Sequence, residues 1–450
     1  MRDLASRLRD IVRQNPAGAR EGRAPRELTY VADLEGGLDS GSVAAALGGI
    51  VHECEAGSCV VVERRWDADG WHGHRRVGSM APRPEASLDL FDPRLADASG
   101  WARRVVFFDI ETTGLSGGAG TLAFLAGCGW FEHEDFVVRQ FFLNSPAAER
   151  AMLAALADIF EQASLLVTYN GRTFDVPTME TRWAFHRCAA PTDELPHFDM
   201  LPPARRLWGR LSGGTGRQTT NSGMAESGSC SLTSLERSIL GFHRVGDVPG
   251  FEIPSRYFHF LRTGDATSVE DVLEHNRLDL VSLAAVMQQA LEMAHGGPSC
   301  CRDEREQLGL ARLYERANDV ERAVESYRLA ASGCEREIRV VALSRLAELL
   351  RRSRRHDEAA AAWQELLELA ARGRRVMTRL ERRAAEGLAI HLEHRQKDPV
   401  EAKRYAELLK RDAAGRHRAE AEHRLTRLDR KARTAGDTKG GPSAAPLSFE

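Results

Sequence analysis

The chain has 450 residues, too many for one ordinary hydrophobic core, so we expect two or three domains. Its 42% hydrophobic and 28% charged residues are typical of a globular protein, and no apolar run approaches the ~18–20 residues of a membrane span, which excludes fibrous and membrane-spanning classes. The formal net charge is −3, but residues 302–431 carry 31 Lys and Arg against 24 Asp and Glu, whereas residues 1–301 carry 29 against 39.

The first hundred residues contain few strong patterns. Residues 1–28 begin with a short amphipathic helix (LASRLRDIVRQ) and continue as a linker containing Gly, Arg and Pro. Residues 29–102 form an N-terminal extension in which CVVVERRW (59–66) and WHGHRRVG (71–78) flank the turn signal DADG, and this predicts a β-hairpin. Such a hairpin could extend the sheet of the following domain or stand alone.

Residues 103–296 predict an α/β domain with a mixed sheet and helices on both faces, because three strands precede the first helix and strands and helices then alternate. In chain order the predicted elements are strands at 104–111, 121–131 and 135–143, a helix over 147–163, a strand at 165–169, a helix over 176–187, the short strand HFDML, a helix over 202–208, a flexible insertion at 209–230, the segment SLTSLERSILG and a long helix over 269–295.

From residue 300 to 431 the composition changes to Ala, Leu, Glu and Arg, and a helical repeat is predicted. The repeated positions are Leu310-Ala311, Leu346-Ala347 and Leu388-Ala389, followed in turn by Ala323, Ala359 and Ala402. Paired helices with small residues at their crossings resemble tetratricopeptide-type repeats, and an ordinary helical bundle is the alternative. Residues 432–450, rich in Gly, Pro, Ser and Ala, predict a disordered tail.

The first chemically informative segment is VVFFDIETTGL at 105–115, where a buried strand ends in acids. Asp109 and Glu111 are two residues apart, so both project from one face of the strand while Phe108 and Ile110 point into the core. Alone, this pair could equally be two solvated carboxylates at a strand end. Burying them without a partner would cost several kcal/mol, so a compensating group is expected nearby.

The second segment, LLVTYNGRTFDVP at 165–177, takes a strand through an Asn-Gly turn to Asp175 and a helix. Asp175 could be an N-cap, and Asn170 simply the turn residue. In the neighbouring HFDML, we expect Asp199 to cap the helix that follows.

The third segment is the helix VEDVLEHNRLDLVSLAAVMQQAL at 269–291. On a 3.6-residue period one stripe contains Val272, Asn276, Asp279, Leu283 and Val286. Asp279 is therefore predicted in the buried seam, where an aspartate is uncommon unless it is paired or holds a metal. A salt bridge to Arg277 is the alternative, but Arg277 projects from a different side.

Together the segments supply four carboxylates, which are hard ligands suited to Mg²⁺ or Mn²⁺. Two such ions about 3.5–4 Å apart can activate a water and stabilise the leaving oxygen in phosphodiester cleavage. Zinc is not expected, because the eight cysteines show no CxxC or paired Cys/His spacing. The same cysteine usage, with no signal-peptide core in MRDLASRLRD, predicts reduced thiols and a cytoplasmic location.

DIETTG, YNGRTFD and HNRLD, in this order, resemble the three exonuclease motifs of the DEDD group, the DnaQ-like 3′–5′ exonucleases with a ribonuclease H-like fold. The longer stretches YNGRTFDVPTMETR, HFDMLPPARRLW, SLTSLERSILGFHRVGDVPGFEIPSRYF and EHNRLDLVSLA resemble YprB-type proteins, which pair a nuclease-like domain with a tetratricopeptide-like tail. The resemblance covers 103–296 well, the tail loosely and the first hundred residues poorly.

This resemblance implies roles for individual residues. Asp109 would bridge two metal ions, Glu111 and Asp279 would hold the ion that activates water, and Asp175 would bind the second ion. Leu115 would pack against the terminal base of the substrate, and Asn170 would position the second motif or contact substrate. For Leu115 a core position is the alternative.

The group's histidine branch places four residues between its His and the final Asp, but here three separate His275 from Asp279, which is the spacing of the tyrosine branch. Residues i and i+4 share a helix face, so His275 could deprotonate the attacking water or act as a supporting hydrogen-bonding group.

Three functions remain open from the sequence. The first is a metal-dependent 3′–5′ exonuclease acting on single-stranded DNA or RNA ends, the second a catalytically weak nucleic-acid-binding scaffold whose helical repeats bind a protein partner, and the third an endonuclease of the same fold. An acidic front and a basic rear suit a nucleic-acid enzyme, although arginine-rich solvated helix faces explain the same charge distribution.

Overall fold

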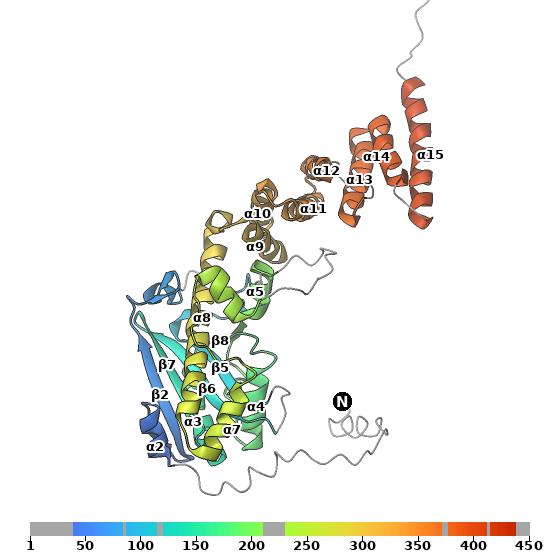
Figure 1. Ribbon diagram of the computed structural model, residues 1–450. Helices are drawn as coiled ribbons and strands as arrows, with labels where there is room; N and C mark the ends of the chain where they lie inside the picture. The colour runs from blue at the N-terminus through green and yellow to red at the C-terminus, as the bar shows by residue number, and fades with distance from the viewer. Residues whose placement is uncertain are drawn as a thin grey trace, which may run out of the picture.

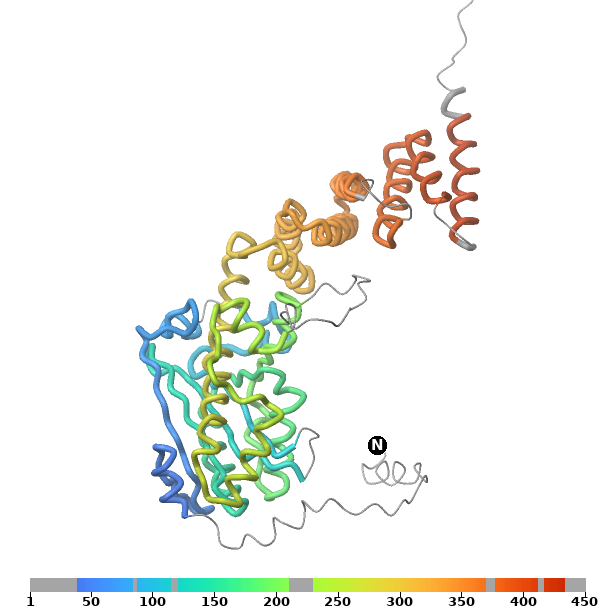
Figure 2. The backbone as a smooth tube through the Cα atoms, viewed as in Figure 1, coloured from blue at the N-terminus to red at the C-terminus, as the bar shows by residue number. Residues whose placement is uncertain are grey.

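A computed structural model describes residues 39–83, 87–114, 120–209, 230–370, 377–411 and 415–437. These residues form a sheet-containing domain followed by a helical arm that extends away from it (Figures 1 and 2). The helix predicted within 1–28, nearly all of the predicted insertion 209–230 and the last part of the predicted tail lie outside the described residues. Within the described ranges, no helix combines the length and the apolar character needed to cross a membrane.

The domain is built on a seven-stranded mixed sheet in the order β1-β2-β7-β6-β5-β8-β9. The strands are β1 (Ile50–Cys54), β2 (Gly57–Trp66), β5 (Val105–Thr112), β6 (Ala123–Glu132), β7 (Asp135–Phe142), β8 (Leu165–Thr168) and β9 (His197–Asp199). β5 runs parallel to β8, and β8 parallel to β9, whereas the other neighbouring strands are antiparallel. The predicted fold class, a ribonuclease H-like mixed sheet followed by a helical region, is confirmed.

Helices cover both faces because the central strand is apolar on both. On β5, Val106, Phe108 and Ile110 belong to a core cluster shared with α3 (Glu149–Glu161), α4 (Asp175–Phe185), α7 (Ile253–Thr263) and the first turns of α8 (Thr267–Gly296). Val105 and Phe107 point the other way, into a cluster shared with α5 (Leu201–Leu207) and the later turns of α8. The alternation along β5 leaves Asp109 and Glu111 on the second of these faces.

The prediction that residues 59–66 pair with residues 71–78 in a β-hairpin is wrong. β2 pairs instead with β1 on one side and β7 on the other, so the N-terminal extension completes the domain's sheet. Val60 and Val62 of β2 are fully buried, and a strand interior of this kind needs a ladder on both edges. The short strands β3 (Trp71–His72) and β4 (Arg75–Arg76) pair only with each other.

Several shorter elements complete the domain, and helix α7 was not anticipated from the sequence. They are α2 (Ser40–Ala46), α6 (Leu232–Leu235), the 3₁₀ turns η1 (Val77–Met80), η2 (Pro93–Leu95), η3 (Trp101–Arg103), η4 (Pro146–Ala148) and η6 (Pro298–Cys300), and the π-helical turn η5 (Glu236–Leu240).

The arm is entirely helical. Its elements are α9 (Glu304–Arg316), α10 (Val320–Ser332), α11 (Arg336–Arg352), α12 (His356–Ala370), α13 (Arg379–His391), the π-helical turn η7 (Leu392–Gln396), α14 (Pro399–Arg411) and α15 (Gly415–Asp437). The leucines and alanines of the predicted repeat are buried. Helix α15 continues to Asp437, so the predicted start of the tail at 432 falls inside a helix.

Candidate active site

The four predicted acids come from three elements that meet beside β5. Asp109 and Glu111 project from β5, Asp175 is the first residue of α4, and Asp279 lies on α8. Burial raises the pKa of Asp109 well above its usual range, and the charges of Asp279, Asp175 and Glu111 raise it further. Carboxylates that influence each other in this way share one site, although their motifs are separated by up to 170 residues of chain.

Glu111 and Asp175 are affected by burial and by the negative charges of neighbouring acids in the same way. Burial, followed by the charges of Asp279 and Asp175, raises the pKa of Glu111 well above its usual range. Burial raises the pKa of Asp175 to about 7, against the lowering effect of backbone N–H donors and with a further contribution from Asp199 and Asp279. The site therefore concentrates negative charge that a bound cation would relieve.

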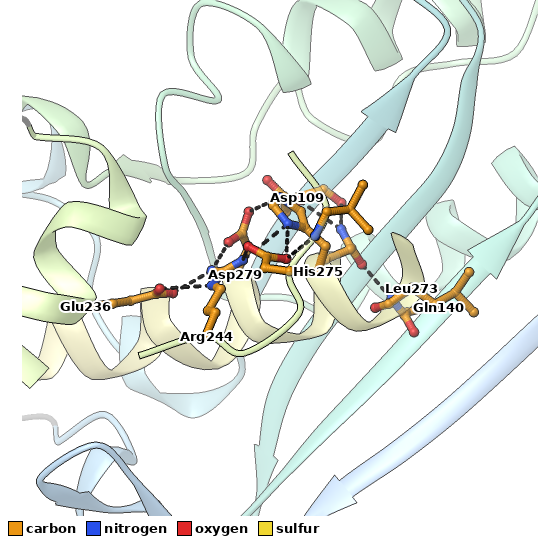
Figure 3. A network of polar contacts seen from close by, with 10 residues as sticks. Asp109, Gln140, Glu236, Arg244, Leu273, His275 and Asp279 are labelled. Carbon is orange, nitrogen blue, oxygen red and sulfur yellow. Dashed lines mark hydrogen bonds and ion pairs between the residues drawn. The ribbon is translucent and has the colours of Figure 1, made fainter. Parts of the chain in front are cut away.

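Asp109 is oriented by Asn276, one helical turn before Asp279. Asn276 is fully buried, and its Nδ2 donates to Asp109 Oδ2 at 2.8 Å and to the Asp109 carbonyl at 3.2 Å. Gln140 on β7 donates in turn to Asn276 Oδ1 at 2.8 Å and to the Leu273 carbonyl, also at 2.8 Å (Figure 3). This chain of hydrogen bonds fixes α8 against the sheet at the level of the acids.

A glycine allows this close approach. Gly127 lies opposite Asp109 in the β5–β6 ladder, and a Cβ at this position would lie 2.1 Å from Asn276 Oδ1 and 2.8 Å from Leu280 Cδ1. Any side chain on Gly127 would therefore push α8 away from the sheet.

The second motif is organised by Asp199. Its Oδ1 accepts from the backbone amide of Asn170 at 2.8 Å and from that of Leu201, the first residue of α5, at 3.0 Å, while Oδ2 accepts from the Arg172 amide at 3.2 Å. Met200, not Asp199, occupies the N-cap position of α5, but the Asp199 carboxylate accepts from the first amide of that helix, and it also holds the turn that precedes Asp175.

Asp175 itself is not an N-cap. Phe174 occupies that position, and no side chain caps the start of α4. Asn170 is exposed and takes a left-handed φ of 69°, with its Oδ1 accepting from Thr173 Oγ1 at 2.9 Å, so in this structure it is the turn residue. Leu115 lies outside the described residues.

Asp279 is half-buried and paired with an arginine, but the partner is Arg244 rather than Arg277. Arg244 Nη2 donates to Asp279 Oδ1, and the Arg244 side chain is only 2% exposed. Arg277 instead pairs with Glu274 on its own helix, at 2.5 Å. The side of α8 on which Arg277 projects was predicted correctly, whereas the arginine from the preceding loop was missed.

His275 lies on the same helix face as Asp279, as the spacing predicted. Its Nε2 is 3.6 Å from Asp279 Oδ2, and its Nδ1 is 2.7 Å from Asp247 Oδ1 (Figure 3). Arg244 Nη1 also lies 3.3 Å from His275 Nδ1. Asp247 thus fixes the ring, which leaves the Nε2 edge turned toward the acids.

The donor chemistry of Asp109, Glu111 and Asp175 fits a hard divalent cation, because none of these three carboxylates makes an ion pair with a basic side chain in the described part of the chain. Asp279 does not fit equally well, since it is already paired with Arg244. Among the described residues, no group of three or more His, Cys, Asp or Glu side chains, these acids included, already stands close enough together to hold a metal ion, so binding one would require Asp109, Glu111 and Asp175 to draw together.

The sequence reasoning missed four further residues of the site. They are Gln140, Glu236, Arg244 and Asp247. Glu236, Arg244 and Asp247 lie in SLTSLERSILGFHRVGDVPGFEIPSRYF, the stretch that resembles YprB-type proteins between the second and third motifs. The only local sign of these site residues is an arginine and an aspartate in a loop without a clear sequence pattern. Neither residue type indicates which side chain it contacts in the folded protein.

Comparisons with known proteins agree with this architecture. Residues 106–291 match the RNase_H_2 model, described as RNase_H superfamily. The chain is 30% identical over 330 residues to "Uncharacterized protein YprB" of Bacillus subtilis (strain 168), an alignment that covers 72% of this chain and 74% of that protein. The matched region contains Asp109, Glu111, Asp175, His275 and Asp279. The chain therefore belongs to the family of YprB-like proteins with an RNase_H superfamily domain.

Proposed function

We propose that this chain is a metal-dependent nuclease that hydrolyses phosphodiester bonds at the 3′ ends of single-stranded DNA or RNA. The observation that carries the proposal is the convergence of four acids from β5, α4 and α8, in which the charges of Glu111, Asp175 and Asp279 raise the pKa of Asp109 and the charge of Asp279 raises those of Glu111 and Asp175. A scaffold with no cation to bind would gain nothing from burying these mutually repelling carboxylates.

The implied cofactor is Mg²⁺ or Mn²⁺, held by Asp109, Glu111 and Asp175. When bound, such an ion would activate a water molecule and stabilise the leaving oxygen of the phosphodiester. The sequence predicted two ions, with Asp279 as a ligand of one. The number of bound ions depends on whether Asp279 can break its ion pair with Arg244 and become a metal ligand.

His275 is the proposed proton acceptor. In the tautomer that donates from Nδ1 to Asp247, at 2.7 Å, the Nε2 lone pair can take the proton of the attacking water. Asp247 also stabilises the imidazolium that forms, so the Asp247–His275 pair would act together. Asp279, 3.6 Å from Nε2, lies on the side from which the proton would arrive.

The 3′–5′ direction follows from the motifs alone, as do two substrate contacts. Leu115 would pack against the terminal base, and Asn170 would contact the substrate or position the second motif. The exposed side chain of Asn170, at the turn before α4, is compatible with a substrate contact. Preference between DNA and RNA is left to experiment.

The second candidate function is a nucleic-acid-binding scaffold whose arm binds a protein partner. The ion pair between Arg244 and Asp279 favours it, because this pair neutralises one of the four acids without a metal. An inactive protein that still binds single strands would support the scaffold over the nuclease.

The deciding experiment is the stepwise shortening of a 5′-labelled oligonucleotide from its 3′ end in Mg²⁺ or Mn²⁺. We expect shortening by the natural chain and a loss of at least about 100-fold in its rate in Asp109→Asn, because this change removes the carboxylate at the centre of the cluster. Asp271→Asn, an exposed acid on the same helix, is the matched control and should keep full activity. Equal activity in Asp109→Asn would rule out the proposed chemistry, and cleavage of circular single strands would indicate an endonuclease.

A further inference from the structure

Arg244 is the basic side chain at the centre of the acidic cluster. It lies on the loop between η5 and α7, its side chain is 2% exposed, and it contacts Glu236, Asp247 and Asp279. Arginine stays protonated at any physiological pH, so Arg244 brings a permanent positive charge to the place where a metal ion was expected. The close-up view shows the guanidinium between Glu236 and Asp279 (Figure 3).

Glu236 holds the Arg244 side chain in its position beside Asp279. Its side chain is fully buried, and it accepts from Arg244 Nε at 2.9 Å and from Arg244 Nη2 through its other oxygen. Departure of Arg244 would leave the Glu236 carboxylate buried without a counter-charge.

The loop is also held in place from outside the cluster. The amide of His74 donates to the Leu240 carbonyl at 2.8 Å, and the His72 ring packs on Phe242 at 4.1 Å between centroids. His72 Nε2 lies 2.8 Å from Ser282 Oγ on α8, so the β3–β4 ribbon joins the loop to the helix that carries Asp279. Arg244 is therefore part of a fixed framework and not a surface side chain that happens to fold inward.

Arg244 holds one oxygen of Asp279 within this framework. Oδ1 accepts from Arg244, and Oδ2 lies 3.6 Å from His275 Nε2. The charge of Arg244 also acts on Glu111, where it opposes the other acids and lowers the pKa. A second divalent cation bound between Asp279 and Glu111 would lie close to a guanidinium that cannot lose its charge.

We propose that Arg244 is an internal cation that replaces one of the two metal ions, so that the centre binds a single divalent ion on Asp109, Glu111 and Asp175. This inference rests on the proposed function. In this arrangement Asp279 is not a metal ligand, and Arg244 is a positioning residue that holds Asp279 beside His275.

The test counts bound Mn²⁺ in the full-length protein by electron paramagnetic resonance of the free ion. We expect one ion per natural chain and two per chain in the Arg244→Met, Glu236→Gln double variant, which removes the internal cation together with its buried counter-charge. The Arg256→Met, Asp271→Asn double variant removes an ion pair to the same helix at an exposed position and should still bind one ion.

A second variant tests the inference without disturbing Glu236. Asp279→Asn should leave the number of ions and the Mn²⁺ dissociation constant unchanged within about threefold, because Asp279 is not a ligand. A loss of more than about 100-fold in Mn²⁺ affinity would overturn the inference, since it exceeds the roughly 10–100-fold cost of changing a supporting residue and would make Asp279 a ligand.

The outcomes separate the two proposals. Two ions in the natural chain, or one ion in a folded Arg244→Met, Glu236→Gln variant, would overturn the internal-cation inference and leave the nuclease proposal intact. No Mn²⁺ binding by any of these proteins would overturn both, because the acids would then not hold a metal at all.

Discussion

At the scale of single residues, the candidate site contains carboxylates that repel one another, and a few hydrogen-bond donors in fixed positions offset part of this repulsion. Asp109 receives a hydrogen bond from Asn276, and Asp279 receives one from Arg244, but Asp175 has only backbone donors against its burial. Its pKa of about 7 means that it is partly protonated near neutral pH when no metal is bound. The protein thus has acids whose ionisation a cation would favour.

This protonation predicts how stability depends on pH. The pKa of Asp175 is about 7 in the folded chain and 3.8 in its ordinary state, so between these values the folded protein binds more protons than the unfolded one. The free energy of unfolding of the metal-free protein must then fall as pH rises through this window, by about 1.4 kcal/mol for each unit of pKa difference.

Asp175→Asn removes this effect. In EDTA we expect the variant to melt a few degrees higher than the natural chain at pH 8, and we expect the gain to shrink at pH 5, where Asp175 is protonated in the folded state. Thermal denaturation at the two pH values measures the difference, with Asp271→Asn as the exposed control. A lower Tm at pH 8 would contradict the expectation.

The proposed proton acceptor makes a separate prediction. His275→Gln should lower the rate of nucleotide release by about 10²–10⁴-fold, because no other group in the described site occupies the position facing the Asp279 carboxylate from the same helix face. Mn²⁺ binding should not change, since His275 is not a ligand in the proposal. A variant that keeps the natural rate would leave His275 in a supporting role.

At the scale of secondary-structure elements, the site depends on how closely α8 approaches the sheet. The helix carries Asn276 and Asp279, and its distance from β5 is set by the absence of a side chain at Gly127. In Figure 1 helix α8 lies over the central strands of the sheet, and it contacts β5, β6 and β7. The same helix continues toward the arm, so α8 connects the two parts of the molecule.

Gly127→Ala should therefore affect stability and the site together. The new methyl group would meet Asn276 Oδ1 and Leu280 at distances that no relaxed packing allows, and we expect a loss of about 1–3 kcal/mol in the free energy of unfolding. Mn²⁺ affinity should fall as well, because Asp109 loses its hydrogen bond from Asn276. Gly120→Ala, where no atom lies within 4 Å of the added Cβ, is the matched control. An unchanged Tm in Gly127→Ala would show that α8 can shift freely.

At the scale of the whole molecule, the arm joins the domain through a polar and close-packed contact. Trp208, just after α5, donates from Nε1 to Glu306 on α9 at 3.0 Å, and a Cβ at Gly309 of α9 would lie 2.6 Å from the Leu207 carbonyl. Along the arm, many basic side chains pair with acids of neighbouring helices, as in Arg339 with Glu365 at 3.2 Å. Much of its positive excess is therefore already neutralised locally.

This pairing predicts that the arm adds little to phosphate binding. Arg383 and Arg395 line a cavity of about 530 Å³ between α11, α12 and α13, and neither makes an ion pair with an acid in the described part of the chain. In an Asp109→Asn background, where cleavage is not expected, changing both to Gln should alter the slope of log K against log salt by less than the ~0.7 of a single phosphate contact. A decrease of about 0.7 for each residue on a single strand would instead assign phosphate contacts to the arm.

The sequence by itself determined the parts that local patterns encode. Short apolar runs predicted β5 to β9, the 3.6-residue period predicted α8, and the i,i+4 spacing placed His275 and Asp279 on one face. Each of these follows from chain geometry over a few residues, and so the motif acids could be found without a structure. How each acid functions remains a prediction.

Only the tertiary structure decided which groups compensate those acids. The partner of Asp279 is an arginine 35 residues away, β2 pairs with the distant β7 and not with the segment 71–78 that follows it, and the glycine that admits Asn276 lies on another strand. Contacts of this kind depend on which surfaces meet after the chain has folded back on itself. No local period encodes them, because a buried charge is satisfied by whatever lies next to it in space.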